Sequence, residues 1–449
     1  MEQRVKSLFK KLSTNQQQKL EHVHVGEASE FYFACRNGET EKVKQLLPNI
    51  PYHQLNQLEP NGSTALHAAT FFGHLDIVHL LLHDYSCQRH LRNRHGFTAY
   101  EEAETDEMRQ LFHRPSDANR FNDDSMNLEK TFQIVLVPLD TAETDGSDYG
   151  DHAEKPDQRC CLSYETHEEV QRYLDGLSGV KEFSQSRVGR YIMKQGMKLK
   201  LGKDTGYNEE EYAVITNEKF RQDALQNLLD EYVTPQHSSY RCCCELLQQY
   251  VEQGKIEDLL KLYTMETPFY HQLLISSSPL GFPFFLHLSE LKQRFYEGYS
   301  YRGAGLTMSE LETYRWVLKK KNSILSSLPF SSTSIVREVA EKFCEKSALS
   351  SDKQRVLFIY HFPQPCSTAI NLSEIPEYKL PCISFFENEK EVLVSTRTYF
   401  KVTKIESDEC KVQYVISLEA LYEAQRTVFD SLKMFIKDDL KTKANKKTS

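Results

Sequence analysis

The feature that most constrains the fold is an internal repeat in the N-terminal quarter of the chain. Residues 62–69 have the sequence GSTALHAA, and residues 73–82 have the sequence GHLDIVHLLL. Residues 96–103 echo the first segment thirty-four positions later, and residues 38–47 echo the second segment thirty-five positions earlier. A repeat of this length indicates stacked pairs of helices, because one pair cannot bury its apolar face alone.

Each repeat has a physical interpretation as a helix pair. Glycine permits the tight turns, Thr64 begins the first helix, and the small Ala68 and Ala69 let the second helix pack closely. The second helix is expected to bury Ile77, Val78, Leu81 and Leu82. The motif resembles the ankyrin repeat, which implies about three repeats over residues 28–112, with degenerate outer repeats and a surface that binds a protein partner.

Composition places the chain among soluble proteins with more than one domain. It has 449 residues, 39% of them hydrophobic, and a formal net charge of −9, which argues against nucleic acid as the main partner. We find no secretory signal and no membrane-spanning run, so we expect a cytoplasmic protein that does not bind a membrane. The eleven cysteines include adjacent ones at 160–161 and 242–244 and no C-x-x-C pair, which indicates reduced thiols and no metal site.

The middle of the chain carries weaker signals. Residues 132–137 are typical of a buried strand, and the acidic, turn-rich residues 143–151 are typical of a loop. We therefore describe residues 113–238 as a linker or unassigned α/β region. At the other end, the lysine-rich residues 431–449 form a basic C-terminal tail.

Residues 239–430 form the third predicted region, with helices first and a strand-rich half after them, which favours an α+β domain. The apolar spacing predicts one amphipathic helix over residues 246–263, and residues 264–268 predict a helix stop and restart. Strands are expected at 356–360, 399–405 and 410–416.

Three separated motifs in this region carry a chemical signal. The first is Arg302, whose planar fork suits a pyrophosphate, followed by Gly303 and Gly305, which would let the backbone approach a ligand closely. The second is the run Ser332-Thr333-Ser334, whose first hydroxyl could orient a ribose or a carboxylate. The third is the pair Glu389 and Glu391, which should point the same way because side chains alternate along a strand. Such a carboxylate can stabilise the oxocarbenium-like centre that forms when a glycosidic bond breaks.

Each motif taken alone also has a structural explanation. Arg302 could form a surface ion pair, Ser334 could cap the helix predicted over residues 335–343, and the two glutamates could be solvated acids at a strand end. The order and joint spacing of the motifs favour a site that holds a dinucleotide.

In this order the motifs resemble the R-S-E group of mono-ADP-ribosyltransferases, of the arginine-specific animal and toxin type. The resemblance covers about residues 240–420, and the segments 262–270 and 301–303 also fit the animal branch. It implies a domain with N-terminal helices and a mixed β-sandwich core. It also implies NAD⁺ as co-substrate, with NADP⁺ as a possibility, no metal, release of nicotinamide, and acceptor proteins that contain arginine.

The resemblance assigns the nucleotide to one group of residues. Arg302 would contact the NAD⁺ phosphate, and Gly303, Thr333 and Ser334 would complete the cofactor-binding set. Ser332 would support both the nicotinamide ribose and the catalytic glutamate.

The reaction itself is assigned to the two glutamates. Glu391 would stabilise the cation through the ribose 2′-hydroxyl, and Glu389 would favour arginine as the acceptor. Together with Arg302 and Ser332 they make up the predicted catalytic set. Phe385 and Phe386 would lie in a loop that faces the target protein.

The chain departs from the family pattern in residues 394–397, where animal members tend to have a proline-containing turn, and in an extended loop at 374–378. These departures leave the choice of target open. The histidine and tyrosine of the poly-ADP-ribosylating branch are absent, so we do not expect chain elongation. The main prediction is an NAD(P)⁺–protein-arginine ADP-ribosyltransferase. A catalytically inactive ankyrin scaffold and an NAD⁺ glycohydrolase are the alternatives.

Overall fold

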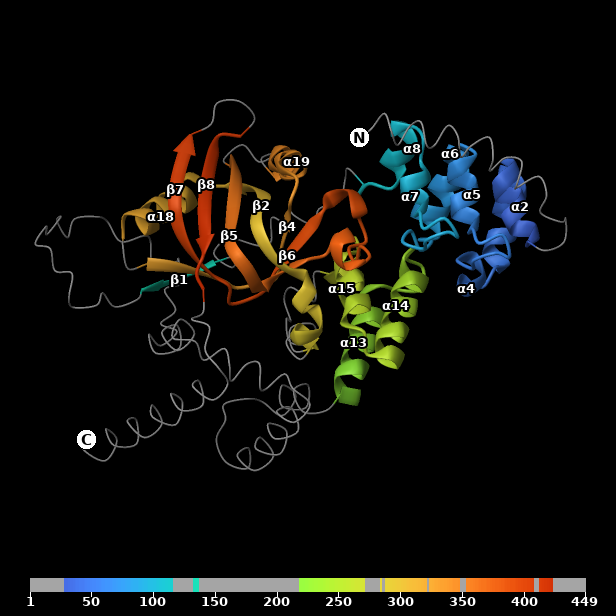
Figure 1. Cartoon of the computed structure of the whole chain (residues 1–449), viewed down its shortest axis with the longest axis horizontal. Coiled ribbons are helices and arrows are strands. Elements are labelled where there is room, and N and C mark those ends of the chain that lie inside the picture. Colours follow the sequence, from blue (N-terminus) through green and yellow to red (C-terminus); the bar gives the residue numbers. More distant parts are fainter. Residues whose placement is uncertain are drawn as a thin grey trace, which may run out of the picture. The chain divides into compact units, whose positions relative to one another are not determined.

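The structure is a computed structural model, and its described residues form two compact units. One unit comes from residues 1–115 and 229–252, and the other from residues 116–228 and 253–449 (Figure 1). The predicted acidic loop at 143–151 and the basic tail at 431–449 lie outside the described residues. Those residues are 28–115, 132–136, 218–270, 283–284, 287–320, 323–347, 353–407 and 412–422.

The first unit is built from short helices whose starts repeat along the chain. Ser29, Thr64 and Thr98 precede α2, α5 and α7, and each side chain accepts the backbone N–H three residues later. This hydrogen bond satisfies a donor that the helix leaves open, so the sequence marks each start locally. The elements are α2 (Glu30–Asn37), α3 (Thr40–Leu46), η1 (Leu47–Asn49), α4 (Tyr52–Leu55), α5 (Ala65–Phe71), α6 (Leu75–His79), η2 (Leu80–Asp84), α7 (Ala99–Glu102) and α8 (Asp106–Leu111).

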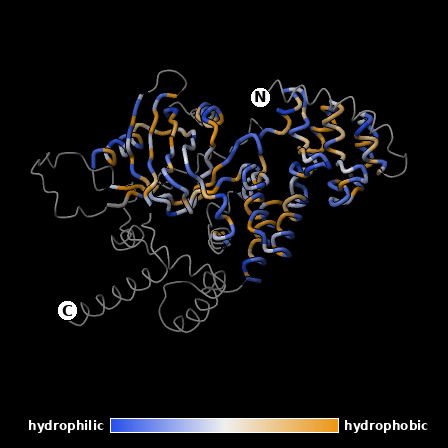
Figure 2. Tube along the Cα trace, in the orientation of Figure 1, coloured by the Kyte–Doolittle hydropathy of each residue, from blue (hydrophilic) through white to orange (hydrophobic). Residues whose placement is uncertain are grey.

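The core of this unit agrees with the prediction from the repeat. Ile77, Val78 and Leu81 are fully buried, Leu82 is nearly so, and Ala69 is completely enclosed. Hydrophobic and hydrophilic residues alternate along these helices (Figure 2). Each fully buried branched side chain contributes about 1.5–3 kcal/mol, so the stack is held mainly by contacts between neighbouring helices.

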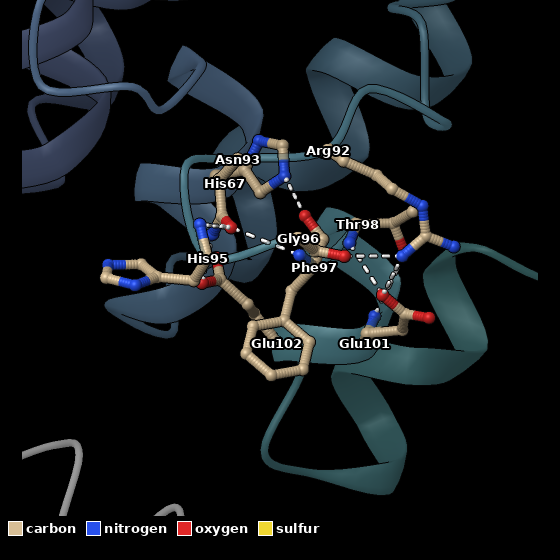
Figure 3. Close-up of polar contacts among 9 residues, drawn as sticks. All are labelled: His67, Arg92, Asn93, His95, Gly96, Phe97, Thr98, Glu101 and Glu102. Carbon is tan, nitrogen blue, oxygen red and sulfur yellow. Dashed lines mark hydrogen bonds and ion pairs between the residues drawn. The ribbon is translucent and has the colours of Figure 1, made fainter. Parts of the chain in front are cut away.

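A buried histidine joins one repeat to the next. The Nδ1 of His67 lies 2.7 Å from the Thr64 hydroxyl. Its Nε2 lies 3.0 Å from the Phe97 carbonyl oxygen, a contact that Figure 3 shows. Because a carbonyl can only accept, Nε2 carries the hydrogen and the Thr64 hydroxyl donates to Nδ1. The ring therefore fixes the turn that leads into α7.

The helix α14 (Tyr240–Gln253) groups with the first unit. Just before it, the Ser239 hydroxyl bonds to the Ser86 hydroxyl at 3.0 Å. The prediction of one helix over 246–263 is wrong, because Gly254 has a φ of +67° and ends the helix. A left-handed residue of this kind is a common helix terminator.

The chain returns to the second unit at α15 (Ile256–Thr264), and the described residues of this unit contain a sheet of eight strands. Their order is β1-β3-β7-β8-β5-β2-β4-β6, and β5 also pairs with β6. The pair β5–β8 is parallel and the other pairs are antiparallel, so the sheet is mixed. The strands follow one hydrogen-bonded order, and the β-sandwich arrangement stays a prediction. The strands are β1 (Phe132–Leu136), β2 (Phe295–Leu306), β3 (Ser323–Ser327), β4 (Ser331–Ser334), β5 (Gln354–Asn371), β6 (Glu391–Val394), β7 (Tyr399–Ser407) and β8 (Tyr414–Ala420).

The strand predicted over 132–137 is confirmed as β1, which pairs with β3 at one end of this sheet. The strands predicted at 356–360 and 399–405 are confirmed within β5 and β7. The strand predicted over 410–416 is displaced, since β8 starts at Tyr414. The helical elements are α13 (Glu218–Tyr232), α15 (Ile256–Thr264), η4 (Leu288–Arg294), α18 (Met308–Lys319), α19 (Arg337–Ser347), η5 (Pro376–Tyr378) and η6 (Glu387–Glu389).

Aromatic rings fill the core beneath the sheet. The Phe400 ring lies 6.1 Å from Phe132, 5.3 Å from Tyr360 and 6.0 Å from Phe362, each in an edge-to-face arrangement. Such pairs add about 0.5–1.5 kcal/mol beyond their buried area. Among the helices that the structure describes, none has the length and hydrophobicity of a membrane-spanning segment.

Candidate active site

The first two predicted motifs and Glu391 of the third lie on three neighbouring strands. Arg302 is on β2, the run 331–334 forms β4, and Glu391 begins β6. Tyr301 pairs with Ser334 across β2 and β4, and Ser334 pairs with Glu391 across β4 and β6. Segments almost ninety residues apart in sequence are thus brought together by sheet register.

All of the predicted site residues line one cleft. The helix α19 closes one side of it through Val339, Ala340 and Phe343. The predicted residues that it brings together are Arg302, Gly303, Ser332, Thr333, Ser334, Glu389 and Glu391.

Arg302 is the cation of the cleft. Its side chain is half-buried, and one guanidinium nitrogen donates to the Ser332 carbonyl oxygen at 2.8 Å. This bond holds the planar group against β4, so its position is fixed before any ligand enters.

The hydroxyls of β4 fasten the strand to its neighbours. Thr333 donates to the Val392 carbonyl oxygen at 2.9 Å and shares a hydrogen bond with the Ser300 hydroxyl. Ser334 donates to the Glu389 carbonyl oxygen at 2.6 Å and accepts from the Val336 N–H at 3.0 Å. Ser334 is therefore not the cap of the next helix, which begins at Arg337.

The backbone that brings the two carboxylates into the cleft differs from the predicted strand. Glu389 ends the short helix η6, Lys390 has a φ of +46°, and only Glu391 is on a strand. The expectation of two glutamates on one extended strand is wrong, and a left-handed turn at Lys390 separates them instead. Both are buried, with 5% and 2% of their surfaces exposed, so solvation at an exposed strand end does not describe them.

Sequence analysis missed the hydroxyl that contacts Glu391. Ser384 donates to Glu391 Oε2 at 2.7 Å, and the next residue, Phe385, donates its backbone N–H to the Thr264 hydroxyl at 2.7 Å. A serine seven residues before a glutamate gives no local signal, because only the folded loop brings the two together. These contacts place α15 next to the loop that leads to the glutamates.

A buried arginine supports the base of the same loop. Arg294 is 1% exposed, and its guanidinium donates to the carbonyl oxygens of Asn371, Ser373 and Pro381 at 3.3, 3.2 and 2.7 Å. Burial lowers the pKa of Arg294, and the nearby Glu257 carboxylate opposes this change. The side chain stabilises the end of β5 and both ends of the segment after it.

Gly303 has a second role beside the one predicted. A Cβ at this position would lie 2.2 Å from the Ala340 carbonyl oxygen and 2.6 Å from the Cys344 backbone nitrogen. The absent side chain thus lets α19 rest directly on β2.

Phe385 and Phe386 lie in the loop that is predicted to face a target protein. They are 5% and 2% exposed, and their rings pack on each other at 5.3 Å. Both rings are therefore buried beneath the loop, and the orientation of the loop toward a target protein stays a prediction.

The two ends of the chain are similar to different known proteins. A family model for ankyrin repeats matches residues 4–106 in three copies. The N-terminal part holds ankyrin repeats. A Notch-regulated ankyrin repeat-containing protein from Xenopus laevis is 37% identical over 71 residues, which are 15% of this chain and 61% of that protein.

Solved structures with similarity include ADP-ribosyltransferases. The Vis toxin from Vibrio splendidus is 19% identical, covers 51% of this chain and 96% of its own, and has a TM-score of 0.25. HopU1 of Pseudomonas syringae pv. Tomato DC3000 is 10% identical, covers 49% of this chain and 99% of its own, and has a TM-score of 0.30. TM-scores this low do not establish a common fold.

Proposed function

We propose that this protein transfers a single ADP-ribose unit from NAD⁺ to arginine side chains of other proteins and releases nicotinamide. The observation that carries the proposal is the shared cleft. A guanidinium, a row of hydroxyls and the Glu391 carboxylate lie on three adjacent strands, and the buried Glu389 lines the same cleft from the end of η6, in the order that resembles the R-S-E group.

The nucleotide would bind along β2 and β4. Arg302 supplies a fixed planar cation for the pyrophosphate, with Gly303 beside it on the strand. Ser332 lines the cleft and would orient the nicotinamide ribose, and Thr333 and Ser334 hold the strand in place through the bonds described above. NADP⁺ is a possible second donor.

The reaction would take place at Glu391. Loss of nicotinamide leaves positive charge on the ribose, and a carboxylate that binds the ribose 2′-hydroxyl stabilises this charge as it develops. A buried carboxylate acts strongly here because little water screens it.

Glu389 would select the acceptor. It lies in the same cleft, and a carboxylate can accept two parallel hydrogen bonds from one edge of a guanidinium and take a proton as the new bond to carbon forms. The proton is shared with Glu389 in the transition state, because a free guanidinium does not deprotonate. We also propose that the ankyrin repeats bind a partner or target protein, since such repeats supply binding surfaces.

The test uses labelled NAD⁺, an arginine-rich acceptor, and the full chain. Glu391→Gln should reduce both nicotinamide release and transfer by about 10²-fold or more. Glu389→Gln should lose transfer to arginine but retain hydrolysis of NAD⁺. Glu341→Gln is the matched control. Glu341, on α19, is a buried carboxylate like the two glutamates, but it does not line the cleft.

Three outcomes would contradict the proposal. A Glu391→Gln protein with wild-type transfer removes the assignment of the reaction to this cleft. Equal loss of transfer and hydrolysis in Glu389→Gln contradicts the separate roles of the two glutamates. A wild-type protein that produces only free ADP-ribose supports the glycohydrolase alternative instead.

A further inference from the structure

The loop before β6 contains a buried serine that faces the proposed catalytic carboxylate. Ser384 is 0% exposed, and its hydroxyl donates to Glu391 Oε2 at 2.7 Å. Glu391 itself is 2% exposed, so this contact lies away from bulk water. Away from bulk water, a single hydrogen-bond donor fixes the rotation of a carboxylate. It thereby determines which of the two oxygens stays available for a ligand.

The backbones of Ser384 and Glu391 both form hydrogen bonds with Leu372. The N–H of Leu372 donates to the Glu391 carbonyl oxygen at 2.9 Å. The N–H groups of Ile383 and Ser384 donate to the Leu372 carbonyl oxygen at 2.7 and 3.3 Å. Leu372 therefore sets the distance between the serine and the glutamate, and the hydroxyl contact does not depend on a free loop.

A second hydroxyl holds the segment that carries Ser384. Thr264, at the end of α15, is fully buried and accepts the Phe385 N–H at 2.7 Å. Its own hydroxyl donates to the Lys261 carbonyl oxygen at 2.8 Å, in the last turn of the helix. A continuous series of hydrogen bonds and one peptide link thus runs from α15 through Thr264, Phe385 and Ser384 to Glu391.

We propose that Ser384 is a positioning residue for Glu391, and that Thr264 supports it from α15. This inference rests on the proposed function. The Ser384 hydroxyl keeps the carboxylate turned toward the cleft, so that Glu391 meets the ribose without first reorganising. Displacement of a reacting group by about 1 Å reduces the rate by up to 10²-fold, which sets the scale of the effect.

The experiment compares steady-state kinetics of full-length variants, with nicotinamide release from NAD⁺ as the readout. Ser384→Ala should lower kcat by about 10- to 100-fold while KM for NAD⁺ changes by less than about threefold, because Arg302 and β4 are untouched. Ser384→Thr retains a hydroxyl and should recover most of the lost kcat. Thr264→Val should lower kcat in the same direction by a smaller factor.

The matched control is Ser323→Ala. Ser323 is 2% exposed, and its hydroxyl donates to the Val317 and Lys320 carbonyl oxygens at 2.8 and 2.7 Å. It lies outside the cleft, so Ser323→Ala should lower thermal stability and leave kcat unchanged. A purely structural role for Ser384 predicts that Ser384→Ala behaves like this control, and that result overturns the inference.

The outcomes separate the two proposals. A wild-type protein that releases no nicotinamide overturns the proposed function and this inference with it. An active wild type together with a Ser384→Ala kcat within about twofold of it overturns the inference alone. If Ser384→Ala does not fold, a Thr264→Val kcat equal to wild type, or a Ser384→Thr protein that folds but lacks activity, contradicts the positioning role.

Discussion

Replacing Gly303 with alanine tests how the cleft is built. The added Cβ would lie 2.2 Å from the Ala340 carbonyl oxygen and 2.8 Å from Cys344 Sγ. The nearest atom belongs to the backbone of α19, so no side-chain rotation relieves the contact and the whole helix must move. Overpacking costs about 1–3 kcal/mol, and a backbone clash places this variant near the upper value. For a unit of this size, that corresponds to a fall in Tm of about 6–12 °C.

The same movement should damage ligand binding. The helix α19 carries Val339, Ala340 and Phe343, which line the cleft, so a displaced helix changes the shape of the site. Differential scanning calorimetry gives the stability, and isothermal titration with NAD⁺ gives the affinity. Gly73→Ala is the control, because Gly73 has a φ of +80° but no atom within 4 Å of an added Cβ. It should cost about 1 kcal/mol through backbone strain and leave NAD⁺ binding unchanged. A Gly303→Ala protein with wild-type Tm and affinity would refute this account of the packing.

Two further substitutions test the two units separately. In the first unit, burial raises the pKa of Glu102 from about 4.5 to about 7. As the pH rises, the unfolded chain releases this proton before the folded chain does, so stability should fall by about 3 kcal/mol between those values. Glu102→Gln keeps an acceptor for Asn93 and should remove this change, which thermal unfolding near pH 5 and near pH 8 measures. If Glu102→Gln keeps the pH dependence of the wild-type stability, the change does not come from Glu102. In the second unit, Arg294→Met removes the donor to three carbonyl groups, and urea unfolding should show a loss of about 3–5 kcal/mol. Wild-type stability of this variant would contradict the role of the guanidinium.

The ankyrin repeats could be predicted from the sequence because their structure depends on local contacts. Thr64 caps its helix through a bond to a residue three positions away, and the apolar face follows from helical spacing. The long helix over 246–263 was mispredicted because apolar spacing continues across Gly254, whose left-handed backbone ends the helix.

The candidate site was predictable in its members but not in its geometry. The order of Arg302, Ser332 and Glu391 along the chain indicated a shared site, and strand register brings them into one cleft. The turn at Lys390 and the contact from Ser384 were not predictable, because both depend on how the loop before β6 packs against α15.

The most direct test of the central claim is mass spectrometry of an arginine-rich acceptor after incubation with NAD⁺ and the full-length protein. We expect one ADP-ribose group on arginine side chains, and none when Glu391→Gln replaces the wild type. Absence of modification with the folded wild type, or equal modification with Glu391→Gln, would contradict it.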